Sequence, residues 1–429
     1  MSENGSCPFS FSRRGFLGLA GGLAAAGFGV GAKALGSTPP QVTAADPTAF
    51  EPFWGTHQAG IVTPLQTHTY FATFDLATDK GDDVIALLKA WTVASARMAK
   101  GETAQPVEGQ TSEAVPADSG ESLGLAPAGL TITIGFGPGL FTKDGKDRYG
   151  LATKRPAAFI DLPAFTGDQL VPEHTGGDLS VQACSDDPQV AFHAVRQLAR
   201  LANYKAQIRW TQAGFMTKPK DGGTPRNLMG FKDGTGNPLY TDQSLMDKIV
   251  WVGAEGPDWM QGGSYMVARR IRIALEHWDQ MKIGFQEQTV GREKYSGAPI
   301  GMKKESDPLD LNAGDKDGNP VIAENAHVRL AAAAPNDGAQ ILRRPYSYND
   351  GVNFTAERWP PWRQGMEYDA GLFFICYQRD PRRSFIKIYE KMAKFDMMNQ
   401  FVTHIGGGLF AIPPGMKEGE FVGQRLFAA

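Results

Sequence analysis

A chain of 429 residues is long enough for about two domains, and its 42% apolar and 21% charged residues are ordinary for a soluble globular protein. The formal net charge of −3 gives no reason to expect nucleic acid or an anionic membrane as a partner. The sequence contains no CxxC pair and no HExxH motif, so the common zinc sites are excluded as well.

The N-terminus carries the pattern of an export signal. Residues 12–17 read SRRGFL, a twin-arginine pattern, and an apolar Gly/Ala-rich run and a small-x-small cleavage site (AKA, residues 32–34) follow. We predict a signal peptide at residues 1–34 and a periplasmic or otherwise exported protein, whose net charge becomes −5 when three cations and one anion leave with the leader. A membrane anchor is the alternative, but the run is short and glycine-rich for a stable span. Because the twin-arginine route exports folded proteins, a cofactor can be inserted beforehand.

A Pro- and Ala-rich linker or arm at residues 35–55 precedes a half that alternates strands with helices. Alternating and β-branched residues predict four strands, at residues 66–76, 130–136, 178–183 and 204–210. Apolar spacing predicts two helices, at residues 82–100 and at residues 187–202. We expect His193 on the polar face of the second helix and an exposed loop at the polar, Pro-rich residues 101–121.

A Lys-, Gly- and Pro-rich stretch at residues 217–226 marks the expected boundary between two domains, residues 56–220 and residues 221–429. The second half is predicted to hold strands at residues 265–275, 341–348 and 371–378, helices at residues 277–289 and 384–394, and a long loop at residues 296–320. The last helix has no clear stop before Asp396 and could continue past it. This order predicts an α+β fold of two ferredoxin-like domains, with antiparallel sheets and peripheral helices.

Three cysteines offer little scope for disulfide chemistry. Cys7 leaves with the leader, and Cys376 lies in an apolar run (residues 372–377) typical of a buried strand. We therefore do not expect a Cys184–Cys376 disulfide, even in an oxidising compartment. The absence of a CxxCH motif excludes covalently attached c-type haem.

Among the seven histidines, His327 has the setting best suited to a metal cofactor. It lies between Ala326 and Val328, and the stretch LAAAA follows at residues 330–334. Neutral imidazole is a good iron ligand, and small neighbours let a flat macrocycle approach the backbone. The alternative for His327 is a purely structural side chain.

Two further motifs carry polar groups that suit peroxide chemistry. Asp233 stands among glycines in GFKDGTGNP (residues 230–238), where it is either an ordinary turn residue or a carboxylate that moves a proton between two peroxide oxygens. Arg343 and Arg344 are either strand-edge cations or a source of one guanidinium that stabilises a departing negative oxygen. Neighbours on a strand face opposite sides, so we expect only one of the two arginines at such a site.

Six stretches together resemble the dye-decolourising peroxidase family, over most of residues 55–425. They are GFKDGTGNP, TVGREKYSGAP, AHVRLAAAAP, ILRRPYSY, GLFFICYQRDP and HIGGGLFAIPPG. The leader and the layout are similar to the exported deferrochelatase/peroxidase branch, which is associated with iron uptake. Two departures, Pro345 after the arginine pair and the loop at residues 101–121, bear on access more than on chemistry.

The resemblance implies a pair of ferredoxin-like domains with haem b in the C-terminal half, and it assigns residues by motif. It implies that His327 is the haem iron ligand, that Asp233 is the acid–base group opposite it and that Arg343, rather than Arg344, is its partner. It also implies cofactor contacts, namely Arg292 to a propionate, Gly234 and Thr235 of the Asp233 motif, the apolar pair Leu372 and Phe374, and Asp396 as the acceptor of a hydrogen bond from His327.

By the same resemblance, the protein uses hydrogen peroxide to oxidise organic donors such as dyes, phenolics or porphyrinogens. Release of iron from haem, a homodimeric state and iron-uptake membrane components as partners are further expectations of this branch. The competing interpretation is a periplasmic haem-binding or iron-extraction protein with little peroxidase turnover, which would share the pocket but would not need Asp233. An exported α+β protein without haem is the third alternative.

Overall fold

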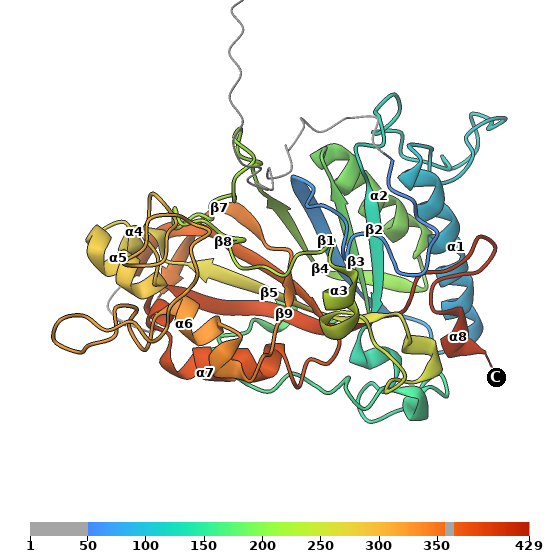
Figure 1. Ribbon diagram of the computed structural model, residues 1–429. Coiled ribbons are helices and arrows are strands. Elements are labelled where there is room, and N and C mark those ends of the chain that lie inside the picture. Colours follow the sequence, from blue (N-terminus) through green and yellow to red (C-terminus); the bar gives the residue numbers. More distant parts are fainter. Residues whose placement is uncertain (1–49, 357–363, 429) are drawn as a thin grey trace, which may run out of the picture. The chain divides into compact units, whose positions relative to one another are not determined.

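The computed structural model of the protein describes residues 50–356 and 364–428 (Figure 1). The predicted leader, its cleavage site and all but the last residues of the predicted arm lie outside the described residues. Within the described ranges, no helix is both long enough and apolar enough to cross a membrane.

The strands of the described ranges form one antiparallel sheet in the order β5-β9-β2-β3-β1-β4-β7-β8-β6. A further antiparallel pairing of β5 with β8 connects strands from the two ends of this order. The bounds are β1 His68–Leu76, β2 Thr131–Phe136, β3 Leu179–Ser185, β4 Ala206–Phe215, β5 Ser264–Ile273, β6 Leu342–Arg343, β7 Tyr346–Ala356, β8 Gln364–Gln378 and β9 Val402–Ile412. The fold is therefore a mixed α/β fold with an antiparallel sheet, and the finer division into two ferredoxin-like domains stays a prediction.

Two helices, α1 (Gly81–Ala99) and α2 (Pro188–Leu201), lie beside the strands of the first half and enclose the larger hydrophobic core (Figure 1). Asp187 caps α2, because its carboxylate accepts hydrogen bonds from two backbone amides of the first turn. The buried Trp91 of α1 donates from its indole nitrogen to the carbonyl of Leu198, 2.8 Å away, and so joins the two helices. Both predicted helices and the four strands predicted in this half are confirmed, although β4 continues beyond its predicted end.

The helices of the second half are shorter. They are α3 Gln243–Ile249, α4 Leu275–Trp278, α5 Ile283–Val290, α6 His327–Ala331, α7 Phe385–Phe395 and α8 Gln424–Phe427. The single helix predicted at residues 277–289 is wrong, because a turn separates α4 from α5. Trp278 is fully buried at the end of α4, and the Gln286 side chain donates to its carbonyl, 2.9 Å away, which holds the chain folded back on itself.

Several strands of the second half differ from their predictions. β8 begins at Gln364 rather than at residue 371, and two further differences have a physical reason. The strand predicted at residues 341–348 is interrupted between β6 and β7, because Pro345 has no N–H to donate to the ladder. Strand β9 was not predicted at all, since its glycine run at residues 406–408 is atypical of strands. Gly407 has φ of +138°, and a side chain on it would meet the Ala268 carbonyl oxygen at 2.1 Å. The glycine is therefore required for β9 to lie against β5. Cys376 is buried in β8, as predicted, and both it and Cys184 are free thiols.

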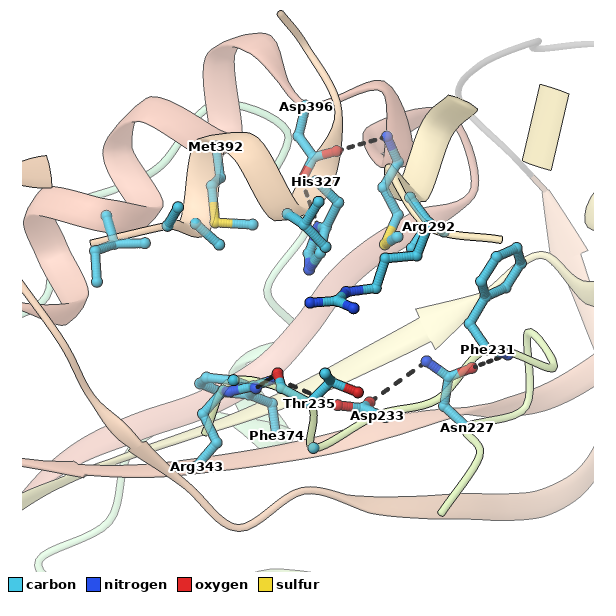
Figure 2. A pocket seen from close by; sticks show the side chains of 18 of the residues that line it. Asn227, Phe231, Asp233, Thr235, Arg292, His327, Arg343, Phe374, Met392 and Asp396 are labelled. Atoms are coloured by element: carbon cyan, nitrogen blue, oxygen red, sulfur yellow. Dashed lines mark hydrogen bonds and ion pairs between the residues drawn. The ribbon is translucent and has the colours of Figure 1, made fainter. Parts of the chain in front are cut away.

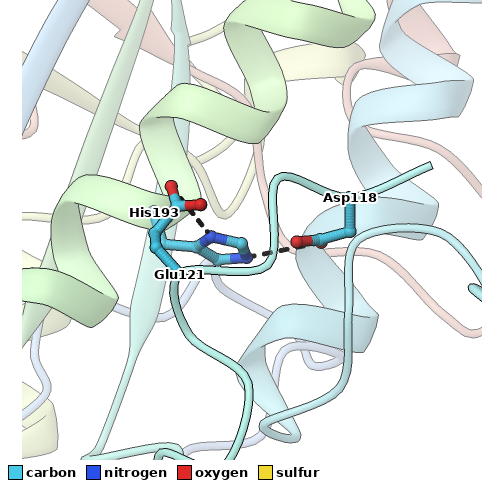
Figure 3. A group of neighbouring side chains, drawn as sticks. All are labelled: Asp118, Glu121 and His193. Carbon is cyan, nitrogen blue, oxygen red and sulfur yellow. Dashed lines mark ion pairs between the residues drawn. The ribbon is translucent and has the colours of Figure 1, made fainter. Parts of the chain in front are cut away.

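His193 lies among polar groups on the side of α2 on which it was predicted, but it is buried. Its side chain is only 3% exposed, because the end of the loop at residues 101–121 covers this face of α2 (Figure 3). Nε2 of His193 lies 3.4 Å from Asp118, and Nδ1 lies 3.2 Å from Glu121. The three groups are close enough together to hold a metal ion, but the two carboxylates face different ring nitrogens. This geometry fits an imidazole that bridges two carboxylates and fastens the loop to α2.

The Glu121 contact predicts a pH-dependent contribution to stability. Burial raises the pKa of Glu121, but bonds from the Ser119 hydroxyl, the backbone and His193 outweigh burial and lower that pKa from 4.5 to about 2. Because the pKa of Glu121 is lower in the folded than in the unfolded protein, the ionised carboxylate stabilises the folded state above pH 4.5. This stabilisation is lost as the pH falls towards 2. Glu121→Gln should therefore lower the free energy of unfolding by about 1 kcal/mol at neutral pH.

Urea denaturation at pH 7, 5 and 3 checks this expectation, with the exposed Glu108→Gln of the same loop as the control. The difference between wild type and Glu121→Gln should shrink between pH 5 and pH 3. A difference that stays constant over this range would rule out the carboxylate charge as its origin.

Candidate active site

A cavity of about 580 Å³ opens in the second half of the chain, between α6 and α7 on one side and β8 and the turn at residues 227–238 on the other (Figure 2). Its lining combines apolar side chains of the helices and strands with a small number of charged groups. Every residue that the sequence analysis assigned to the site lines this cavity: Asp233, Gly234, Thr235, Arg292, His327, Arg343, Leu372, Phe374 and Asp396.

His327 is the first residue of α6, and its ring projects into the cavity (Figure 2). Its Nδ1 lies 2.7 Å from Oδ2 of Asp396, while the side chain remains 35% exposed. This exposed part faces the cavity, so Nε2 is the nitrogen available to a ligand. Burial lowers the pKa of His327, but the charge and hydrogen bond of Asp396 outweigh burial and raise that pKa above its ordinary value. A carboxylate behind the imidazole is the arrangement that fixes a metal-binding histidine.

Asp396 is itself held in place by the backbone. α7 ends at Phe395, and Asp396 has extended backbone angles, φ −69° and ψ 123°, so the helix does not continue past it. The carboxylate caps the short 3₁₀ turn that follows, because Oδ1 accepts a hydrogen bond of 2.8 Å from the Met398 amide. Because both of its carboxylate oxygens are hydrogen-bonded, Asp396 holds the His327 ring in one orientation.

Asp233 and Arg343 lie on the opposite wall of the cavity and face His327 (Figure 2). Arg343 donates from one terminal nitrogen to Oδ1 of Asp233 at 3.3 Å, and from the other to the Thr235 carbonyl at 3.2 Å. The Asn237 side chain fixes the backbone of Arg343 on both sides, since it accepts from its N–H at 2.9 Å and donates to its carbonyl at 3.0 Å. A carboxylate and a guanidinium are thus held side by side above an apolar space.

Arg344 points to the other side of the strand, as the alternation of strand side chains predicts. It is only 2% exposed and donates to the carbonyl of Thr63 and, at 2.7 Å, to the Gln66 side chain. Arg343 is therefore the member of the pair that reaches the cavity.

Arg292 and two side chains of β8 complete the surroundings. The guanidinium of Arg292 donates to the carbonyls of Gly297 at 2.8 Å and Glu305 at 3.3 Å, and burial lowers the pKa of Arg292 below its ordinary range. Because one of its terminal nitrogens makes both of these bonds, the guanidinium keeps donors for an anionic ligand. Leu372 and Phe374 add apolar surface from one face of β8.

His404 and Glu305 are among the polar cavity residues that were not predicted. His404 of β9 accepts a hydrogen bond of 3.0 Å from Arg269, and burial together with this arginine lowers the pKa of His404 far enough to keep its ring neutral. Its motif HIGGG was recognised, but nothing in it marks the histidine as a cavity residue. Glu305 lies in the stretch at residues 296–320, which was predicted only as a long loop.

The lining fits an iron porphyrin. A histidine nitrogen backed by a carboxylate, a broad apolar wall and an arginine near the rim match the iron, the ring and the carboxylate edge of haem.

Comparison with known proteins finds relatives in one family. Residues 58–216 match the family model "Dyp-type peroxidase, N-terminal" and residues 224–417 match "Dyp-type peroxidase, C-terminal". The chain is 36% identical to a protein named Dye-decolorizing peroxidase from Thermobifida fusca (strain YX), over 97% of each chain. It is also 36% identical to a protein named Deferrochelatase from Escherichia coli (strain K12), over 97% of this chain and 96% of the relative. The solved oxyferrous complex of DtpA from Streptomyces lividans is 38% identical, with a TM-score of 0.79 over 89% of this chain and 98% of that structure.

Proposed function

The chain belongs to the Dyp-type peroxidase family, and from this membership and the cavity geometry we propose that it is a haem b peroxidase in which His327, Asp233 and Arg343 form the reactive centre. One observation carries this proposal. Nε2 of His327 faces a paired carboxylate and guanidinium across a cavity of about 580 Å³. This is the arrangement that peroxide cleavage at a metal requires, with a metal ligand on one side and proton-transfer groups on the other.

Several side chains would hold the cofactor. When bound, haem supplies an iron atom that exchanges electrons with hydrogen peroxide and with an organic donor. His327 would hold this iron through Nε2, and Asp396 keeps the ring oriented and the proton on Nδ1. Arg292 would bind a propionate through charge-assisted hydrogen bonds. Leu372 and Phe374 would cover the apolar ring and limit the entry of water.

Asp233 and Arg343 would act on the peroxide. A carboxylate oxygen of Asp233 takes the proton from one peroxide oxygen and delivers it to the other, which can then leave as water. The Arg343 guanidinium stabilises the negative charge that develops on the departing oxygen. Gly234 and Thr235 bring the backbone of the turn to the cavity wall, and the Thr235 carbonyl anchors Arg343. With two electrons and two protons from the donor, each peroxide yields two water molecules.

An absorption spectrum of the purified protein, before and after addition of hydrogen peroxide, tests this function. We expect a Soret band that shifts with peroxide and returns to its starting position when a reducing dye is added. A band that ignores peroxide would favour a haem-handling protein, and no band after haem is supplied would contradict haem binding altogether.

Release of iron from haem is a second candidate function, supported by the relatives named Deferrochelatase. Here haem would be the substrate, and the products would be free iron and an intact porphyrin. Fluorescence of metal-free porphyrin, followed together with an iron chelator, distinguishes this reaction from peroxidase turnover. No rise in fluorescence under reducing or oxidising conditions would remove this function from the proposal.

The finer architecture is also part of the proposal. The first family match ends at residue 216 and the second begins at residue 224, so the gap between them overlaps the predicted boundary at residues 217–226, which supports a division into two domains. Limited proteolysis should cut first in this stretch and give two fragments that stay associated. Cutting at other sites first would argue against the boundary.

Location and partners rest on the leader and on the family resemblance. We propose export to the periplasm by the twin-arginine route, which cell fractionation with an Arg13→Lys, Arg14→Lys double variant would test. Crosslinking in intact cells would test iron-uptake membrane components as partners.

A homodimer is proposed as well. The hairpin of β7 and β8 exposes four large apolar side chains in two cross-strand pairs, Val352 with Tyr368 and Phe354 with Met366. Exposed apolar groups that cluster in this way are typical of an interaction surface. Light scattering that gives a monomer at micromolar concentration would contradict the dimer.

A further inference from the structure

The loop at residues 296–320 places the hydrogen-bonded side chain of Glu305 at the cavity. Its carboxylate is 20% exposed and lines the cavity. The next residues of the loop, Ser306, Asp307 and Leu309, line the cavity as well. A segment that was predicted only as a long loop thus forms part of the cavity wall.

The Glu305 carboxylate accepts hydrogen bonds from three side chains of the turn that carries Asp233. Oε1 accepts from the hydroxyl of Thr235 at 2.7 Å and from the hydroxyl of Thr224. Oε2 accepts from the ammonium of Lys232, with which Glu305 forms an ion pair. One carboxylate therefore joins the start and the end of the stretch at residues 224–235, which carries Asp233, to the loop at residues 296–320.

These bonds hold the chain on either side of Asp233. Lys232 is its immediate neighbour, and Thr235 is two residues further along. Arg343 restrains the same short stretch from the other direction, since it contacts Oδ1 of Asp233 and the carbonyl of Thr235. Glu305 and Arg343 together leave the stretch little freedom to move.

The same loop packs against the side chain of Lys232. A side chain on Gly297 would meet Cδ of Lys232 at 2.7 Å, so the loop backbone packs directly on the lysine. The ammonium of Lys232, the residue next to Asp233 in sequence, is paired with the Glu305 carboxylate. Burial opposes the ionised form of Glu305, but its bonds to Lys232 and the two threonines lower the pKa of Glu305 below its ordinary value.

The loop also touches Arg292, through the backbone rather than the side chain of Glu305. The guanidinium of Arg292 donates to the Glu305 carbonyl at 3.3 Å. Glu305 is thus bonded both to the turn that bears Asp233 and to the arginine proposed to bind a propionate.

We propose that Glu305 is a positioning residue for Asp233: it clamps the turn at residues 224–235 to the cavity wall and so fixes the carboxylate that handles the peroxide protons. This inference rests on the proposed peroxidase function. Glu305 acts through Lys232, Thr224 and Thr235, and it does not itself touch the peroxide. An exposed ion pair would contribute almost nothing, but this carboxylate is largely buried and bonded to three groups.

Glu305→Ala and Glu305→Gln test the proposal in the full-length protein. The alanine variant should lower kcat/KM for hydrogen peroxide about 10-fold and leave KM for the organic donor unchanged, because a small displacement of a proton-transfer group slows only the peroxide step. The glutamine variant keeps an oxygen for the two threonines and should lose only about 3-fold. Hydrogen exchange of the haem-free protein should show faster exchange of peptides from residues 224–237 in the alanine variant, while other regions are unchanged.

Glu324→Gln is the matched control. It removes the same charge from the irregular segment that follows this loop, at an exposed residue that is not part of the cavity lining. Peroxide kinetics and hydrogen exchange at wild-type values in Glu305→Ala would overturn the proposal, as would faster exchange spread over the whole chain. The wild-type assay run alongside tests the peroxidase function itself, and the hydrogen exchange needs no haem, so the two failures can be told apart.

Discussion

Replacing His327 with alanine is expected to leave the purified protein almost without haem. The cavity would keep its apolar wall and Arg292, but it would lose the nitrogen that faces its interior. Asp396 would at the same time lose its partner at 2.7 Å and remain as a buried carboxylate with a side chain only 3% exposed. Burying the unpaired Asp396 carboxylate beside the apolar haem ring would cost free energy and weaken haem binding further. We expect haem content to fall to about one-tenth or less of the wild-type value, measured as extracted haem per protein.

Two variants make this result interpretable. Asp396→Asn keeps the His327 ring but removes the charge behind it, and should weaken haem binding about 10- to 100-fold without abolishing it. His68→Ala changes a histidine of β1, away from the cavity, and should load haem like the wild type. Full haem occupancy in His327→Ala would mean that another group holds the cofactor and that the site has been assigned wrongly.

The parts of the fold that could be predicted are those in which local pattern and packing agree. α1 and α2 have apolar faces that pack on the strands, and β1 to β4 have β-branched and aromatic runs, so periodicity alone located them. β9 was not predicted because its glycines are required by close contact with β5. A contact between two segments so far apart in the sequence cannot be inferred from the local residue pattern. The break between α4 and α5 also depends on a distant event, the burial of Trp278, which donates to the Met229 carbonyl at 3.0 Å.

The candidate site shows the same division. Residue type and motif indicated His327, Asp233 and Arg343, but their approach depends on contacts between remote segments. Pairing of β6 with β8 fixes the backbone of Arg343, and the Asn237 side chain forms hydrogen bonds to the same backbone. Strand alternation predicted that only one of the two arginines faces the cavity, and the family resemblance indicated Arg343. The role of Glu305 could not be predicted, because the sequence of a polar loop does not show whether a carboxylate faces solvent or accepts hydrogen bonds from three side chains.

Asp233→Asn is expected to separate a peroxidase from a protein that only handles haem. Asparagine has nearly the same shape, and its oxygen can still accept the bond from Arg343 that Oδ1 accepts at 3.3 Å. The cavity should therefore load haem normally. The amide cannot carry the proton between the peroxide oxygens, so kcat/KM for hydrogen peroxide should fall about 10²- to 10³-fold, within the range usual for loss of a general acid–base group.

The same change at Asp221, an exposed aspartate shortly before the Asp233 turn, is the control and should leave turnover intact. The comparison depends on measuring haem content and turnover in the same samples, since loss of both together would report only a damaged pocket. If Asp233→Asn holds haem and consumes peroxide at the wild-type rate, then the carboxylate opposite His327 has no part in proton transfer. The cavity would then be explained better by binding haem or extracting its iron, because either task needs His327, Asp396 and the apolar wall but not a proton carrier.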